Sequence, residues 1–137
     1  MRLVLAPWAT LAALAALGCG GLRAADLFIV YRTGVSPQQH LTLLVDEEGG
    51  VRCNGRSAGK LNDAQIVEAR GIQEDLHGPA SKRLRLAPQP GAVLHYYARD
   101  PDGSVRFSDN SANQPPVLRR LALFVLRTAQ QACQLRQ

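Results

Sequence analysis

The chain has 137 residues and a formal net charge of +5, because 16 lysines and arginines outnumber 11 aspartates and glutamates. This length suffices for one hydrophobic core and argues against two domains. Aromatic residues make up only 5% of the sequence, too few for a platform that stacks nucleic-acid bases. We therefore expect one mildly basic domain, with no nucleic acid among its partners.

The first residues have the features of an export signal. Arg2 gives a positive charge, and the apolar stretch 3–17 is too short and too rich in alanine for a comfortable membrane span. Ala16-Leu17-Gly18 then precedes Cys19. This pattern resembles the lipobox of bacterial lipoprotein signal peptides, in which small residues precede the lipid-bearing cysteine, although Leu is usual where Ala16 stands. The favoured interpretation is lipid attachment at Cys19.

Two other outcomes stay open for this segment, ordinary cleavage near Ala24-Ala25 and an uncleaved anchor. All three place the domain outside the cytoplasm. The expected organisation is a signal peptide over 1–18, a lipid-anchored tether over 19–26 and a single compact domain over 27–137. We expect the protein on the extracytoplasmic side of the bacterial cell envelope, held to the membrane by its lipid, or secreted if cleavage occurs without lipidation.

The first half of the domain reads as a strand followed by a hairpin. β-Branched and aromatic residues predict a strand over 27–31, short enough to be buried on both faces. Strands over 40–45 and 51–53 are separated by Glu47-Glu48-Gly49-Gly50, which predicts a hairpin. Cys53 is therefore expected near a strand end.

A helix is predicted to begin after Asn62, because Asn62 can cap it and Gln65 holds the reciprocal position of a capping box. Its apolar residues recur every three or four positions and share one face: Ile66, Ala69, Ile72 and Leu76. His77-Gly78-Pro79 predicts its end. The Pro-rich, basic stretch 79–91 is either a short edge strand or a crossing loop, and the loop is favoured.

The clearest hairpin joins strands over 92–99 and 104–108 through an Asp-Pro-Asp-Gly turn. Alternate residues of its first strand face opposite sides, so we expect one set to be buried and the other partly wet. Pro115-Pro116 opens a final helix, whose apolar rhythm points Cys133 at the sheet. The expected fold class is α+β: an antiparallel sheet of about four to five strands with two helices packed on one face, in the order β-ββ-α-ββ-α.

Three cysteines leave one unpaired in an exported chain unless Cys19 carries a lipid. In that case Cys53 and Cys133 are free to form a disulfide bond. The alternative is two buried free thiols. A metal site is not expected, because the sequence has no CxxC or HxxxH spacing.

Catalytic motifs are absent from the sequence: His40, His77 and His95 stand alone, and no nucleophile elbow, zinc-protease motif or phosphate-binding loop is present. His95 reads as a sheet histidine rather than a base. Asp100-Pro101-Asp102-Gly103 reads as a turn, because it lacks the ligands of a calcium loop. We therefore expect no enzyme activity, no cofactor and no metal.

Two stretches resemble the emfourin family, small inhibitors of thermolysin-type metalloproteases. The stretch 29–34, Ile-Val-Tyr-Arg-Thr-Gly, is similar to the family's opening strand, and Tyr96 to Phe107 with Asp109, Pro116 and the leucines of the last helix are similar to its closing strands and helix. Val35-Ser36-Pro37 replaces the glycine-rich continuation of the family. The resemblance implies a non-catalytic domain that inhibits an exported metalloprotease.

The segment 32–39 is polar and is expected to be exposed at a strand end, where a rigid loop can enter a cleft with little loss of entropy. Its candidate partner-binding residues are Arg32, Thr33, Gly34, Ser36 and Gln38. The alternative is plain turn chemistry, in which Gly34 supplies a backbone angle that other residues avoid. A second hypothesis for the whole protein is an envelope structural or assembly lipoprotein whose basic surface binds anionic envelope components.

Overall fold

The computed structural model describes residues 22–135. The predicted signal peptide and the lipid site at Cys19 lie outside these residues. The elements are, in chain order, β1 (Asp26–Gly34), the short 3-10 helix η1 (Pro37–Gln39), β2 (Leu41–Asp46), β3 (Gly50–Cys53), β4 (Arg56–Lys60), α1 (Asp63–Ser81), β5 (Leu94–Asp100), β6 (Gly103–Ser108) and α2 (Pro116–Gln131).

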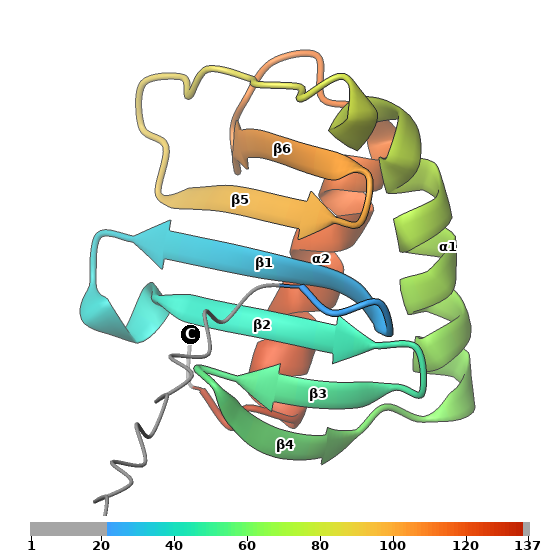
Figure 1. The fold of residues 1–137 in the computed structure, drawn as a ribbon. Coiled ribbons are helices and arrows are strands. Elements are labelled where there is room, and N and C mark those ends of the chain that lie inside the picture. The colour runs from blue at the N-terminus through green and yellow to red at the C-terminus, as the bar shows by residue number, and fades with distance from the viewer. Residues whose placement is uncertain (1–21, 136–137) are drawn as a thin grey trace, which may run out of the picture.

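The strands form one antiparallel sheet in the order β4-β3-β2-β1-β5-β6, and both long helices pack on the same face of it (Figure 1). The predicted α+β class is confirmed. The sheet has six strands rather than four to five. The unexpected strand is β4, which pairs with β3 after a tight turn in which Asn54 and Gly55 both have positive φ, 53° and 80°. Asn-Gly is the preferred sequence for such a hairpin turn.

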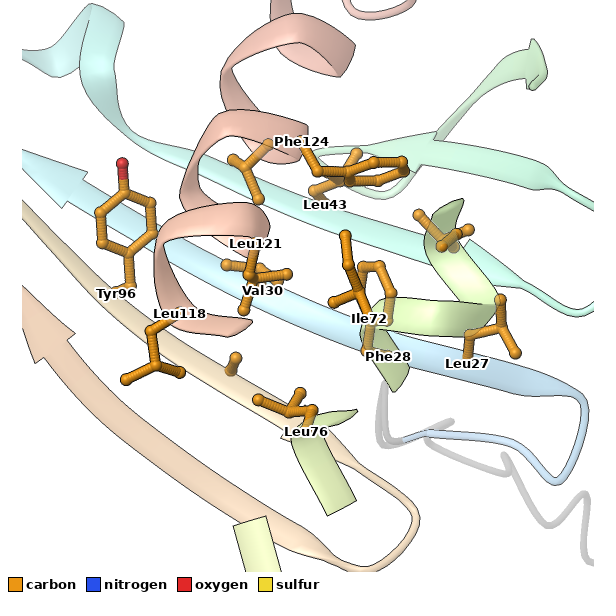
Figure 2. Packing of buried hydrophobic residues seen from close by; sticks show 14 of the residues in the cluster. Leu27, Phe28, Val30, Leu43, Ile72, Leu76, Tyr96, Leu118, Leu121 and Phe124 are labelled. Atoms are coloured by element: carbon orange, nitrogen blue, oxygen red, sulfur yellow. The ribbon is translucent and has the colours of Figure 1, made fainter. Parts of the chain in front are cut away.

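The core lies between the sheet and the helices (Figure 2). Phe28 of β1 meets Phe124 of α2 edge to face, with ring centroids 5.9 Å apart. Fully buried leucine and isoleucine side chains from both helices fill the space beside this pair: Ile72, Leu76, Leu118 and Leu121. In β5, Tyr96 and Ala98 are buried while His95 is exposed and Tyr97 half-buried, as the predicted alternation requires.

The N-terminal cap of α1 is as predicted, whereas its end is not. Asn62 Oδ1 accepts a hydrogen bond from Gln65 N, and Gln65 Oε1 accepts one from Asn62 N. The predicted stop at 77–79 is wrong, because the helix continues through Pro79 to Ser81. Packing holds this last turn: Ala80 is fully buried, and its carbonyl group approaches Gly103 of β6 so closely that a Cβ there would collide with it.

A disulfide bond joins Cys53, at the end of β3, to Cys133, just beyond α2. The Cα atoms are 5.7 Å apart and the residues are separated by 80 positions. The predicted pairing is confirmed, and the alternative of two free thiols is wrong. The bond fixes the end of α2 to the sheet.

The stretch between α1 and β5 is largely a loop, the favoured prediction, rather than an edge strand. Arg85 forms a parallel bridge with Arg106 of β6, and Leu84 and Leu86 on either side of it pack against the core. Leu86 N donates to Arg106 O and Arg106 N donates to Leu84 O, at 2.8 and 2.9 Å. The loop is therefore fastened to the free edge of β6.

Candidate functional site

The predicted contact loop lies at the end of β1, where the chain turns through η1 into β2. Its surface is exposed at Thr33, Pro37 and Gln38, and Val35 is the most exposed large apolar side chain of the described residues, at 85%. Ser36 is half-buried. The prediction of an exposed loop therefore holds for its central part.

Hydrogen bonds fix the backbone of this loop. Ser36 N donates to Gln39 Oε1 at 3.1 Å, and Gln39 N donates back to Ser36 O at 3.0 Å. His40 N donates to Pro37 O at 3.1 Å. Because Pro37 also has a restricted φ, the loop is ordered before any partner arrives.

The prediction that Arg32 is an exposed contact residue is wrong, because its side chain is only 1% exposed. Position 32 continues the alternation of Phe28 and Val30 and therefore points into the core. Arg32 Nε donates to Gln39 O at 2.8 Å, so that the side chain supports the loop from inside. Within residues 22–135, its Nη1 and Nη2 atoms are buried without a hydrogen-bond partner, and burial lowers the pKa of the guanidinium.

Gly34 is required for a different reason from the one expected. Its φ is not positive, so the explanation by a special backbone angle is wrong. A Cβ at this position would collide with the side chain of Gln39. The glycine therefore allows the loop to pack closely on the end of β1.

A second surface lies beside the loop, on the face of the sheet opposite the helices. Tyr31 of β1 stacks on Tyr97 of β5 with ring centroids 5.8 Å apart, and the guanidinium of Arg106 lies 3.9 Å from the Tyr97 centroid. These residues and Thr33 line a hollow of about 650 Å³. No sequence pattern indicated this cluster, because its members are neighbours only through the register of three strands.

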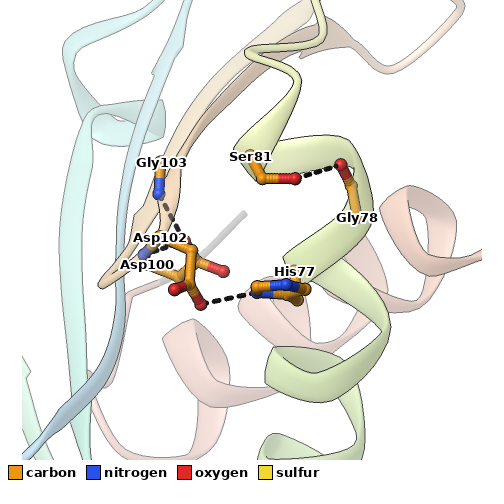
Figure 3. Close-up of polar contacts among 6 residues, drawn as sticks. All are labelled: His77, Gly78, Ser81, Asp100, Asp102 and Gly103. Atoms are coloured by element: carbon orange, nitrogen blue, oxygen red, sulfur yellow. Dashed lines mark hydrogen bonds and ion pairs between the residues drawn. The ribbon is translucent and has the colours of Figure 1, made fainter.

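A histidine and an acid meet at the far end of α1, although the sequence placed every histidine alone (Figure 3). His77 Nδ1 lies 2.7 Å from Asp102 Oδ2. Asp100 Oδ1 accepts hydrogen bonds from the N–H groups of Asp102 and Gly103, which confirms the predicted turn. In the described residues, no group of three or more histidine, cysteine or acidic side chains is arranged to hold a metal ion.

This pair predicts a pH dependence of stability. The hydrogen bond to Asp102, and then its negative charge, raise the pKa of His77 above its ordinary value. A raised pKa in the folded state adds stability that is present below the unfolded pKa and is lost as the pH rises through the folded pKa. We expect the contribution of this pair to the free energy of unfolding, measured by urea titration, to be lost as the pH rises above the ordinary histidine pKa of 6.5.

The variant His77→Gln should flatten this fall. His40→Gln is the matched control, because His40 is also exposed but its Nε2 faces the carbonyl oxygen of Gly34 rather than a carboxylate. An equal pH dependence in wild type and His77→Gln would contradict the assignment.

Neither long helix of residues 22–135 combines the length and the hydropathy that a bilayer span requires. The resemblance to emfourins rests on the residues quoted above. Comparisons of this chain with family models, curated proteins and solved structures found no match.

Proposed function

We propose that the protein is an exported, lipid-anchored and non-catalytic binding domain that inhibits a metalloprotease in the manner of emfourins. The observation that carries this proposal is the loop 33–39, which is exposed and yet locked by its own hydrogen bonds. The lipid on Cys19 would hold the domain at the membrane, on the extracytoplasmic side of the envelope, where an exported protease is met.

A locked loop suits an inhibitor because ordering a flexible loop costs binding free energy. Immobilising one long side chain at an interface costs about 0.5–1.5 kcal/mol, and the backbone adds to this. Here Ser36 and Gln39 bond to each other before binding, and Arg32 holds Gln39 from the core side. The apolar side chain of Val35 projects from this support and can fill an apolar pocket of the partner.

The proposal is tested by titrating a thermolysin-type metalloprotease with the full chain, disulfide intact and in detergent. We expect stoichiometric loss of activity while the domain stays uncleaved. Val35→Asp should weaken inhibition at least about tenfold. Val67→Asp is the matched control, because Val67 is a similarly exposed valine, 68%, on α1. Unchanged protease activity with wild type would refute the inhibitor function.

One observation favours the second candidate, an envelope structural or assembly lipoprotein that binds anionic components. Arg52, Arg99 and Arg106 all lie on the helix-free face, and none of the ion pairs in the described residues includes them. Binding through such exposed charges falls steeply with salt, whereas a contact of complementary shape in a cleft depends on salt much less. The salt dependence of binding to isolated envelopes therefore separates the two functions.

A further inference from the structure

Three rows of side chains cross the helix-free face from strand to strand. One row is Arg52, Leu44, Ile29, Arg99 and Ser104, the next is Thr42, Tyr31, Tyr97 and Arg106, and the last is Thr33, His95 and Ser108. No aspartate or glutamate stands in these three rows. These rows are therefore basic and partly aromatic, whereas Asp46 stands on the same face at the end of β2. The rows favour a partner with negative charge.

The middle row decides what kind of partner fits. Tyr31 covers one face of the Tyr97 ring and Arg106 the other, so neither face of Tyr97 is open for stacking. Binding of single-stranded nucleic acid depends on open ring faces. The row presents ring edges and guanidinium N–H groups to the outside. The guanidinium N–H groups bind carboxylates through directed hydrogen bonds.

The row is also rigid. The loop over 85–88 forms one wall of the hollow, and its hydrogen bonds to the backbone of Arg106 hold it to β6. Tyrosine and arginine are the residue types enriched at the energetic centres of protein interfaces. Side chains that are stacked in advance lose little entropy when a partner binds.

Two arginines on the helix side are paired with acids. Arg120 pairs with Asp75 and Arg127 with Glu68, which ties α2 to α1. Arg85 and Arg106 line the hollow and form no ion pair with the described residues. The Tyr31–Tyr97–Arg106 row therefore lies on a face whose arginines form no ion pair with the described residues.

We propose that this face is a second binding surface, next to the loop 33–39 and sharing only Thr33 with it, and that its partner is a protein surface rich in carboxylates. Arg106 and Arg85 bind the carboxylates, and Tyr97 fixes the plane of the Arg106 guanidinium. The surface does not depend on protease inhibition, because Val35 lies in the loop beyond the end of β1 and outside the three rows.

The test measures binding of the full chain to fluorescein-labelled poly-L-glutamate by anisotropy, with phosphatidylglycerol vesicles and an oligothymidylate as competing probes. Arg106→Gln should weaken polyglutamate binding about tenfold. Arg106→Lys keeps the charge but loses the planar group, and should also weaken it. Arg119→Gln is the control, since it removes one exposed charge from α2, on the other side of the sheet, and should change binding less than twofold.

Equal losses in Arg106→Gln and Arg119→Gln would overturn the proposal, because they would show binding by overall charge. Tighter binding of the vesicles or of the oligothymidylate than of polyglutamate, with the same dependence on Arg106, would overturn the choice of a protein partner. Val35→Ser removes the apolar side chain without adding charge and should leave polyglutamate binding unchanged, so that failure of this surface and failure of the inhibitor function are recorded separately.

Discussion

Replacing both Cys53 and Cys133 by serine is expected to lower the free energy of unfolding by about 4 kcal/mol. The disulfide closes a loop of 80 positions, which strongly restricts the unfolded chain. The loss is large, because the whole free energy of unfolding of such a domain is only about 5–15 kcal/mol. Urea titration followed by far-ultraviolet circular dichroism at 25 °C measures the difference.

Wild type with a reductant provides the control for this prediction. Reduced wild type and the double serine variant should unfold at the same urea concentration, because each lacks only the cross-link. If the double variant kept the midpoint of the oxidised wild type, the disulfide would not stabilise the domain.

Arg32→Met is expected to raise the free energy of unfolding by about 1–4 kcal/mol, the range seen when buried ion pairs are replaced by well-packed apolar side chains of similar size. The guanidinium is almost fully buried, and two of its nitrogens have no partner in residues 22–135. Methionine fills a comparable volume and removes the cost of burying the charge. The measurement is the same urea titration at neutral pH.

Arg32→Ala separates charge from volume in this prediction. It also removes the charge, but it leaves a cavity, so it should be less stable than Arg32→Met. Both variants lose the bond from Nε to Gln39 O and should inhibit a protease less well through a looser loop. Reduced stability of Arg32→Met would show that the guanidinium contributes more than its burial costs.

Local signals predicted most of the fold. The residues Leu27 to Val30 are all buried, as a run of β-branched and aromatic side chains indicates. The helix cap at Asn62 was predictable because it depends only on the four residues from Asn62 to Gln65. The end of α1 could not be predicted from neighbouring residues. The last turn, which contains Pro79, packs closely against Gly103, a residue far along the chain. Asn54-Gly55 is a typical hairpin sequence and indicates a further strand after β3. The strand β4 is nevertheless not predicted, because Arg-Ser-Ala-Gly-Lys is a poor strand sequence.

The candidate surfaces were less predictable, for a physical reason. The loop 33–39 follows a strand directly, so its position could be read from the sequence. The burial of Arg32 depends on how far β1 extends, and the strand continues three residues beyond Tyr31. The row of Tyr31, Tyr97 and Arg106 and the pair of His77 and Asp102 depend on strand register and helix placement, which no local pattern encodes.

The place of β1 in the sheet has a consequence for the order in which the chain can fold. The first strand to leave the ribosome is an inner strand, and its second neighbour, β5, begins only at Leu94. Until β5 has been synthesised, one edge of β1 exposes unpaired N–H and C=O groups, which can pair with strands of other chains. The sheet is therefore completed late, after most of the polypeptide has been synthesised.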